Sequence, residues 1–518
     1  MIRSFMGTGP LTVSSDRGEW VGATASAMNS IDSQFESPIK RTPNANKVRF
    51  VLIADVLGKT HFQNTAEPPN TAIVNVNLIS EEQDLMRTTR RQSRRNLLRS
   101  GLGVAACSPW LPRLSALADA PGSNAAKHCV ILWMPGGPSQ IDTFDMKPGH
   151  ANGGEFKEIQ TASPGLRFSE HLPKLAEWSE RLAVLRGLST KEGDHERATV
   201  LMQTGHRPGG PVAYPAMGCA LTSALFNEDL ELPGYMSVSG SGIPFASSRS
   251  PGFLGPKYAA TLVGANVVPD DYAQLSLDFL SPGPAAGAGD VSERLELWKF
   301  LEQEAARRRP AENVLAHQTV YNRAIRMMQS DARQVFDLSE EPDKVRDAYG
   351  KGVFGQGCLL ARRLIEHGVP LVEVSLGNGL GWDTHLNNFE SVRELSEQLD
   401  AGWSSLMREL DERGLLESTT ILWAGEFGRA PKINPNGGRD HFPQAWSCVL
   451  AGGGIQGGGV YGKTNDSGME VVDGRINEQD VLATLCKSLA IDPSTENITP
   501  DGRPIKIAEG NPIESVLS

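Results

Sequence analysis

The chain has 518 residues, of which 39% are hydrophobic and 21% are charged, an ordinary composition for a globular protein. That length fits one large α/β domain or two smaller ones. The formal net charge of -11 argues against nucleic acid as the main partner, because binding to phosphate backbones demands basic surfaces. The sequence contains no stretch that approaches the roughly 18 apolar residues of a membrane span.

The segment 86–120 has the layout of an export signal. A basic stretch with paired arginines, Arg94 and Arg95, precedes a short apolar segment and several small residues. Paired arginines indicate the twin-arginine route, so we expect a periplasmic or otherwise extracytoplasmic mature protein. Because such a signal stands at an N-terminus, we expect translation to start at Met86 and residues 1–85 to be absent or disordered. Cys107 follows Val-Ala-Ala as in lipoprotein leaders, so a lipid anchor there is the alternative.

The mature domain, 121–518, opens with an apolar run at 129–134 (CVILWM) that predicts a strand. A loop rich in glycine and proline follows it and carries Asp142 and Asp145. A second strand is predicted at 182–188 (LAVLRGL).

Asp194 and His195 then begin a predicted helix that ends near Thr204. Such residues ordinarily cap a helix. Here they also lie at the carboxyl end of a strand, where backbone amides can hold an anion.

The middle of the chain gives weaker signals. Residues 209–285 are rich in Gly, Pro and Ser, so we expect long loops over the mouth of a site. Residues 290–367 predict helices, since apolar residues recur with a helical period in GCLLARRLIEHG.

The segment 369–424 predicts a βαβ unit. Residues 369–376 (VPLVEVSL) and 418–424 (STTILWA) are apolar enough to be buried strands. Between them, apolar side chains recur at spacings of three and four, which is typical of a helix with one apolar face: Leu395, Leu399, Trp403, Leu406 and Leu410. Such a crossover makes a parallel sheet. The expected fold class is therefore α/β, with a doubly wound, mostly parallel sheet and helices on both faces.

Metal-ligating side chains gather where these strands end. Asp383 and His385 follow the first strand, Glu426 follows the second, and Asp440 and His441 come shortly afterwards in GRDHFP. Because ligands bind at the carboxyl ends of parallel strands, we expect a metal centre there. The donor set favours zinc, manganese, magnesium or calcium over copper. Each residue alone is ordinarily a turn-former or a cap.

Several sequence blocks occur in colinear order between about Arg94 and Ile513: WMPGGPSQIDTFDMKPG, SEHLPKL, GDHERATVLMQTG, PGFLGPKYA, GWDTHLNNF, AGEFGRAPKIN and GRDHFPQAWSCVLAGGGIQGG. Together with the twin-arginine leader they resemble the bacterial exported family known as domain of unknown function 1501. More distantly, the chain is similar to the alkaline phosphatase and sulfatase superfamily. That resemblance implies an alkaline-phosphatase-like α/β fold for residues 121–518.

The superfamily resemblance implies a centre with one or two divalent metal ions. It implies six ligand positions: Asp142, His195, Asp383, His385, Glu426 and His441. Asp145 is the alternative to Asp142. His195 stands where phosphatases have serine or threonine and sulfatases an oxidised cysteine, and Phe427 replaces one expected ligand. We therefore expect His195 to be a metal ligand, with direct attack on phosphorus as its alternative role.

The implied activity is metal-dependent hydrolysis of phosphate or sulfate esters outside the cytoplasm, on a small-molecule or glycan anionic ester. His195 and Arg429 are the expected catalytic residues, since Arg429 lies beside a ligand loop and could hold the anionic group bidentately. Arg439 could do the same, and a surface ion pair is the ordinary alternative for both arginines. Two other functions stay open, a non-catalytic metal-binding or ligand-binding protein on the same fold, and a metal-dependent isomerase or mutase.

Overall fold

The computed structural model describes residues 126–227, 229–240, 249–277 and 330–518, together with Phe245 and short pieces between 296 and 327. All of the long ranges belong to one compact unit, 106–518. The expectations for the export signal, for the start at Met86 and for Cys107 concern residues outside the described ones.

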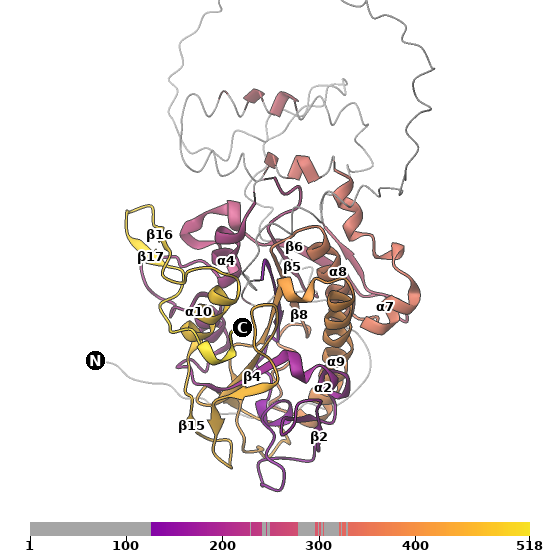
Figure 1. Ribbon diagram of the computed structural model, residues 1–518, viewed down its shortest axis with the longest axis vertical. Helices are drawn as coiled ribbons and strands as arrows, with labels where there is room; N and C mark the ends of the chain where they lie inside the picture. Colours follow the sequence, from indigo (N-terminus) through magenta and orange to yellow (C-terminus); the bar gives the residue numbers. More distant parts are fainter. Residues whose placement is uncertain are drawn as a thin grey trace, which may run out of the picture. The chain divides into compact units, whose positions relative to one another are not determined.

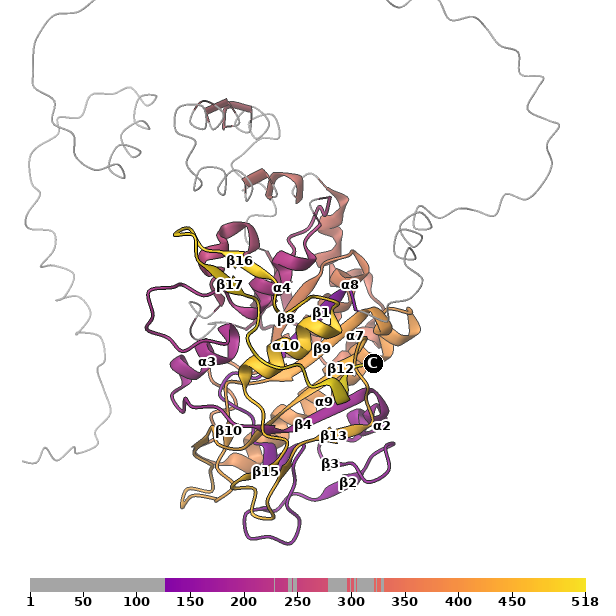
Figure 2. The ribbon, with the colours of Figure 1, turned by 60° about the vertical axis from the view of Figure 1, so that its left-hand side comes forward.

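A nine-stranded mixed sheet forms the centre of this unit (Figures 1 and 2). Its strands, from one edge to the other, are β13 (Gly459–Tyr461), β4 (Leu182–Leu188), β12 (Trp446–Gly452), β9 (Thr419–Ala424), β1 (His128–Trp133), β8 (Leu371–Ser375), β5 (Tyr235–Val238), β6 (Thr261–Asn266) and β7 (Gln274–Ser276). Most neighbours are parallel, but β12 runs antiparallel to both β4 and β9, and β7 runs antiparallel to β6. The four strands predicted from apolar runs all lie in this sheet.

Helices cover both faces of the sheet. The longer ones are α3 (His195–Thr204), α4 (Met217–Leu225), α8 (Val353–Glu366), α9 (Asn388–Glu412) and α10 (Glu478–Ser488), and the short ones are α2 (Pro173–Glu177) and α7 (Asp343–Tyr349). Figure 1 shows α2, α7, α8 and α9 together on one side and α4 with α10 on the other. The predicted fold class, α/β with a mostly parallel sheet between two helical layers, is confirmed.

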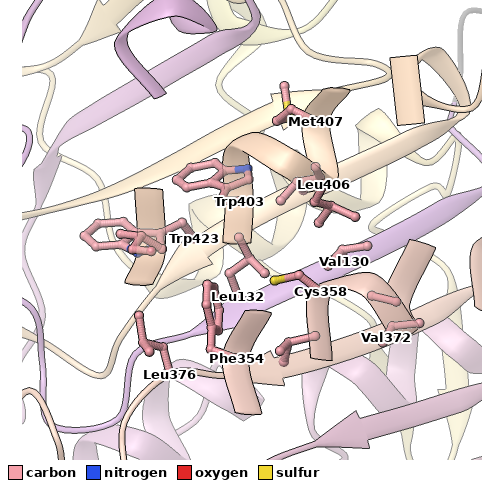
Figure 3. Close-up of a cluster of buried hydrophobic side chains, with 14 of the residues drawn as sticks. Val130, Leu132, Phe354, Cys358, Val372, Leu376, Trp403, Leu406, Met407 and Trp423 are labelled. Carbon is pink, nitrogen blue, oxygen red and sulfur yellow. The ribbon is translucent and has the colours of Figure 1, made fainter. Parts of the chain in front are cut away.

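The two layers follow from the alternation of side chains along β1. Val130 and Leu132 belong to the core that includes residues of α8 and α9, whereas Ile131 and Trp133 belong to the core on the α4 and α10 face. Figure 3 shows the first core, in which Phe354 of α8 and Leu406 of α9 pack on the sheet. Each fully buried side chain of this kind contributes roughly 1.5–3 kcal/mol to stability.

The expectation of long loops over residues 209–285 is wrong for the parts of this segment that the structure describes. This segment forms α4 and the strands β5, β6 and β7, which extend the sheet beyond β8. Its glycines and prolines mark the turns between short elements, and those turns obscured the buried runs MGCALTSAL and YMSV. Short buried elements carry little periodicity of their own.

The strand directions decide where the loops meet. The parallel strands β1, β4, β8 and β9 all end at the same edge of the sheet. Because β12 is antiparallel, it begins at that edge, so the loop that precedes it lies beside the loops that follow the others. Four separate two-stranded antiparallel sheets lie outside the central sheet: β2 (Glu158–Gln160) with β3 (Arg167–Ser169), β10 (Gly428–Arg429) with β11 (His441–Phe442), β14 (Lys463–Thr464) with β15 (Val471–Asp473), and β16 (Glu496–Ile498) with β17 (Pro504–Lys506).

Candidate metal centre

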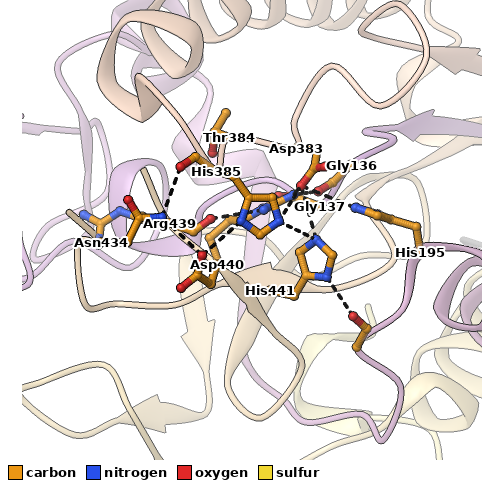
Figure 4. A network of polar contacts seen from close by, with 12 residues as sticks. Gly136, Gly137, His195, Asp383, Thr384, His385, Asn434, Arg439, Asp440 and His441 are labelled. Atoms are coloured by element: carbon orange, nitrogen blue, oxygen red, sulfur yellow. Dashed lines mark hydrogen bonds and ion pairs between the residues drawn. The ribbon is translucent and has the colours of Figure 1, made fainter. Parts of the chain in front are cut away.

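Three histidines converge on Asp383 at the carboxyl edge of the sheet (Figure 4). His195 is the first residue of α3, His385 follows β8, and His441 lies in β11, just before β12. Their Nε2 atoms lie 3.3, 3.3 and 3.2 Å from Asp383 Oδ1, respectively. The Nε2 atoms of His385 and His441 are 3.0 Å apart. The spatial meeting that the sequence predicted for these four residues is therefore present in the structure.

The other ring nitrogen of each histidine contacts an oxygen acceptor. The Nδ1 contacts are His195 with Glu426 Oε1 at 2.7 Å, His385 with Asp440 Oδ1 at 3.0 Å, and His441 with the Gly193 carbonyl at 2.7 Å. A carbonyl can only accept, so Nδ1 of His441 must donate, and an ionised carboxylate imposes the same tautomer on the other two rings. Each neutral ring then presents the lone pair of its Nε2 to the centre.

This arrangement fits a bound cation. The Nε2 atoms of His385 and His441 are close enough, at 3.0 Å, to share either a proton or a metal ion. Nε2 of His195 is buried, and Asp383 Oδ1 lies 3.3 Å from it. Ligand atoms of His195, Asp383 and His441 all lie within 4.8 Å of one another, and His385 adds a fourth donor beside them. Three imidazoles with one carboxylate suit zinc or iron better than magnesium or calcium, which prefer oxygen ligands.

The charges of the centre are strongly coupled. Burial alone would lower the pKa of His195, but hydrogen bonds and charges from Asp383 and Glu426 outweigh it and raise that pKa to about 9. Burial would raise the pKa of Asp383, but the hydrogen bonds from His195, His441 and Arg429 hold it well below its ordinary value. Without metal, His195 therefore carries the positive charge that the centre requires.

This coupling predicts a pH dependence of the metal-free protein. Because the folded pKa of His195 is raised above 6.5, its stabilising contribution is complete below pH 6.5 and is lost as the pH rises through about 9. The melting temperature of chelator-treated protein should fall across that window. The metal-loaded protein should show no such fall, since a ligating imidazole is already neutral. A melting temperature of the metal-free protein that stays constant from pH 6.5 to about 9 would contradict this coupling.

Asp142 does not join the group. It is fully buried and binds the guanidinium of Arg439 through both carboxylate oxygens, at 2.7 and 2.9 Å, and it also accepts from Asn388 Nδ2 at 2.8 Å. Arg439 donates further to carbonyls of Pro431 and Asn152. The pair therefore braces the loop that carries His441. Arg439 forms an ion pair, but the pair is fully buried and not at the surface as its ordinary alternative had it.

Arg429 acts on Asp383 and is not placed to meet a substrate. Its side chain is fully buried, and it donates to Asp383 Oδ1 at 2.5 Å and to the Gly136 and Gly137 carbonyls. A guanidinium with these partners orients the carboxylate that faces the histidines. The anion-binding role expected for Arg429 has no geometric support, because nothing of its side chain reaches the surface.

Glu426 lies behind His195 and does not face the centre directly. Its Oε1 accepts from the Gly136 amide at 2.8 Å as well as contacting His195 Nδ1. An acceptor in this position fixes the orientation of a ligating ring and raises its basicity. Phe427 next to it places its ring 4.9 Å from that of His195 and 4.6 Å from that of His441. Phe427 therefore contacts two of the histidines and offers no ligand atom.

Sequence reasoning overlooked two asparagines that hold the ligand loops. Asn434 Nδ2 donates to the His385 carbonyl at 3.0 Å and to Asp440 Oδ1 at 3.1 Å. Asn388, at the start of α9, connects Asp142 to Thr384 Oγ1. Asn434 lies in the turn sequence NPNGG, where a turn-forming role hides any other.

No curated protein matches the chain. Among solved structures, the chain is similar to the lipoteichoic acid synthase LtaP from Listeria monocytogenes (10% identity, TM-score 0.34, covering 71% of this chain and 73% of that one). It is also similar to the PsFucS1 sulfatase from Pseudoalteromonas sp. (12%, 0.33, 74% and 71%). A third similar structure is the alkaline phosphatase from the Antarctic bacterium TAB5 (12%, 0.32, 71% and 99%).

The family comparison covers nearly all of the described residues. The model of one family, the protein of unknown function DUF1501, matches residues 126–517. This span includes every residue of the candidate metal centre. The expected membership is confirmed, and the chain belongs to the DUF1501 family.

Proposed function

We propose that this protein is a metal-dependent hydrolase of phosphate or sulfate esters that acts outside the cytoplasm. The observation that supports it most is the convergence of three Nε2 atoms and one carboxylate oxygen, with every Nδ1 bonded on its far side. Such bonding pre-organises metal ligands before any ion arrives. The centre also lies at the carboxyl edge of the sheet, where α/β proteins bind their substrates.

The residues divide the work between holding the ion and holding its ligands. His195, Asp383, His385 and His441 would bind the ion, and zinc, manganese or iron would fit this set. When bound, a divalent ion supplies Lewis-acid polarisation of an ester oxygen and acidification of water. Glu426 holds the proton of His195 on Nδ1, and Arg429 fixes the direction of Asp383. The substrate oxygens would approach on the solvent side, where His385 is the most exposed of the ligands, at 42%.

The direct test combines metal analysis with an activity screen. Protein purified without chelator should contain close to one equivalent of a transition metal, and it should hydrolyse an aryl phosphate or an aryl sulfate. Chelation should abolish that turnover, and added zinc or manganese should restore it. A metal-loaded protein that turns over none of these esters would overturn the proposed reaction.

His195 distinguishes ligand chemistry from nucleophile chemistry. Replacing His195 with alanine should lower both the metal content and the hydrolysis, since its Nε2 belongs to the ligand group. The affinity for metal should fall about tenfold or more. If metal content stays full while hydrolysis disappears, His195 acts on the substrate instead. Replacing His367, which follows α8 at the opposite edge of the sheet, with alanine is the matched control, and it should change neither quantity.

The proposed export rests on the leader sequence. Replacing Arg94 and Arg95 together with lysine should stop export and leave the precursor in the cytoplasm, because the twin-arginine route requires the arginine pair. Fractionation followed by immunoblotting measures this. Undiminished export of the double variant would refute the route. A parallel replacement of Arg90 and Arg91 with lysine controls for loss of general basic character.

One observation favours a second function, that of a non-catalytic metal-binding protein. Within the described residues, the two arginines nearest the centre, Arg429 and Arg439, are buried and committed to internal partners. A hydrolase of anionic esters gains from a cation beside the metal, and these two cannot serve. Stoichiometric metal without ester turnover would support this function.

A further inference from the structure

A cavity of about 510 Å³ lies beside the second acidic residue of the first loop, Asp145. Its wall is built from the loop after β1, from Arg186 of β4 and from the turn at β14. The residues that matter for its chemistry are Asp145, Lys147, Arg186, Lys463 and Thr464. A cavity of this size is within the range of ligand-binding pockets.

The floor of the cavity carries more positive than negative charge. Asp145 is almost fully buried and contacts Lys147 Nζ at 2.9 Å, and its other oxygen accepts from Thr464 Oγ1 at 2.5 Å. Arg186 Nε is 3.5 Å from the same carboxylate. One buried carboxylate therefore contacts two cations, and Glu158 on β2 adds a more distant negative charge near Arg186.

Both cations keep donors for a ligand. Lys147 Nζ donates two of its three N–H groups, one to Asp145 and one to Thr464 Oγ1 at 2.7 Å. Arg186 directs Nε and one Nη to the Phe144 carbonyl, and its Nη1 has no hydrogen-bond partner among the described residues. The side chains are 13% and 22% exposed, so they are shielded from water without being closed off.

The rim adds charge of both signs. Lys463 and His150 are exposed at its edge, and so is Asp466. Water and salt screen exposed charges far more than half-buried ones, so the floor dominates the recognition. Burial lowers the pKa of Arg186, while the charges of Asp145 and Glu158 act to raise it.

The cavity and the metal centre share one loop. The Asn152 carbonyl accepts from Arg439 at 2.9 Å, directly before Asp440 and His441, while Asn152 Nδ2 donates to the Ser467 carbonyl at 2.7 Å beside the cavity turn. Arg186 lies two residues before Leu188, the end of β4. Both features therefore open near the same edge of the sheet.

We propose that this cavity is a binding subsite for a second anionic group (sulfate, phosphate or carboxylate) carried by a polyanionic substrate. The identification of the ligand as substrate rests on the proposed hydrolase function. Arg186 Nη1 and the remaining N–H of Lys147 donate to the anion, and Lys463 adds attraction from the rim. Thr464 and Asp145 hold Lys147 in position. The protein thereby selects esters on charged chains over isolated small esters.

Binding can be measured without catalysis. Fluorescent oligomers of dextran sulfate, polyphosphate and polygalacturonate are titrated into the whole protein at physiological salt, with uncharged dextran as the control probe. At least one of the polyanions should bind, and the strongest of them identifies the anion. If none binds better than uncharged dextran, the proposal is overturned.

Two variants and a matched control locate the site. R186Q should weaken polyanion binding about tenfold, as expected for a charged hydrogen bond. Lys463 is exposed, so K463E should leave the fold intact, and it should weaken polyanion binding about threefold or more. K506E, the same reversal on β17 away from the cavity, should bind like the unmodified protein. Equal binding by K463E and K506E would overturn the assignment, even if R186Q failed to fold.

The metal-stripped protein separates this proposal from the function proposed above. If polyanion binding is unchanged by chelation but is weakened by K463E, the subsite is supported even if no ester is hydrolysed. Loss of all polyanion binding on chelation would overturn it, because the anion would then be bound by the metal. Absence of ester turnover alone would refute the hydrolase and leave the subsite supported by its own binding data.

Discussion

Replacing Arg439 with alanine should lower the free energy of unfolding by about 3–5 kcal/mol. The substitution leaves the carboxylate of Asp142 fully buried without its charge partner, and the carbonyls of Pro431 and Asn152 without their donor. An uncompensated buried charge costs far more than a lost surface pair. Urea denaturation of the purified protein, followed by tryptophan fluorescence, measures the change.

Two further variants test the cause of that loss, one as a control and one as a rescue. Arg503 pairs with Asp501 on the surface, with both side chains more than half exposed, so replacing Arg503 with alanine should cost less than about 1 kcal/mol. Replacing Asp142 with asparagine in the Arg439→Ala background should recover part of the loss, since a neutral amide is cheaper to bury than a carboxylate. A loss below about 1 kcal/mol for Arg439→Ala itself would show that Asp142 is not charged in the fold.

Replacing Asp383 with alanine should reduce the affinity for metal by about 100-fold or more, since it removes the carboxylate shared by three imidazoles. It also leaves the buried guanidinium of Arg429 without its only carboxylate contact among the described residues. The metal-free variant should therefore melt below the metal-free parent. Competition with a chromophoric chelator gives the affinity, and elemental analysis gives the stoichiometry.

The comparison variant is Glu426→Gln, which keeps the shape of a residue that only orients His195. Its metal affinity should fall by roughly 10- to 100-fold, which is less than the loss at Asp383. The order of the two effects is the decisive measurement. If Glu426→Gln loses more metal than Asp383→Ala, then Glu426 ligates and Asp383 has the supporting role.

The sequence predicted the framework of this site better than the roles within it. Apolar runs before and after α9 place β8 and β9, and the direction of a crossover puts Asp383 and Glu426 at the same edge. Which carboxylate faces the histidines depends on side-chain direction, which sequence spacing does not specify. Asp383 points to the rings, whereas Glu426 lies behind one of them.

The roles of the two arginines also could not be predicted from the sequence. Arg429 and Arg439 stand beside ligand loops in the sequence, and a site for anionic esters calls for such cations. In the fold, both are fully buried and occupied by Asp383 and Asp142. Burial is a property of the packed structure, so a surface role and a bracing role have the same sequence signature. Asp145, the alternative ligand to Asp142, instead pairs with Lys147 in the wall of a cavity.

The reversed strand β12 has a consequence for the order in which the protein can be built during synthesis. β4 is made early, but its neighbours in the sheet are β12 and β13, which are among the last parts of the chain to leave the ribosome. Until β12 and β13 are synthesised, β4 has no strand to pair with. The helix that carries His195, α3, then follows a strand that is not yet part of the sheet. Pairings between such distant segments form late. Metal loading should therefore follow completion of the chain, and nascent chains arrested before Trp446 should not retain the ion.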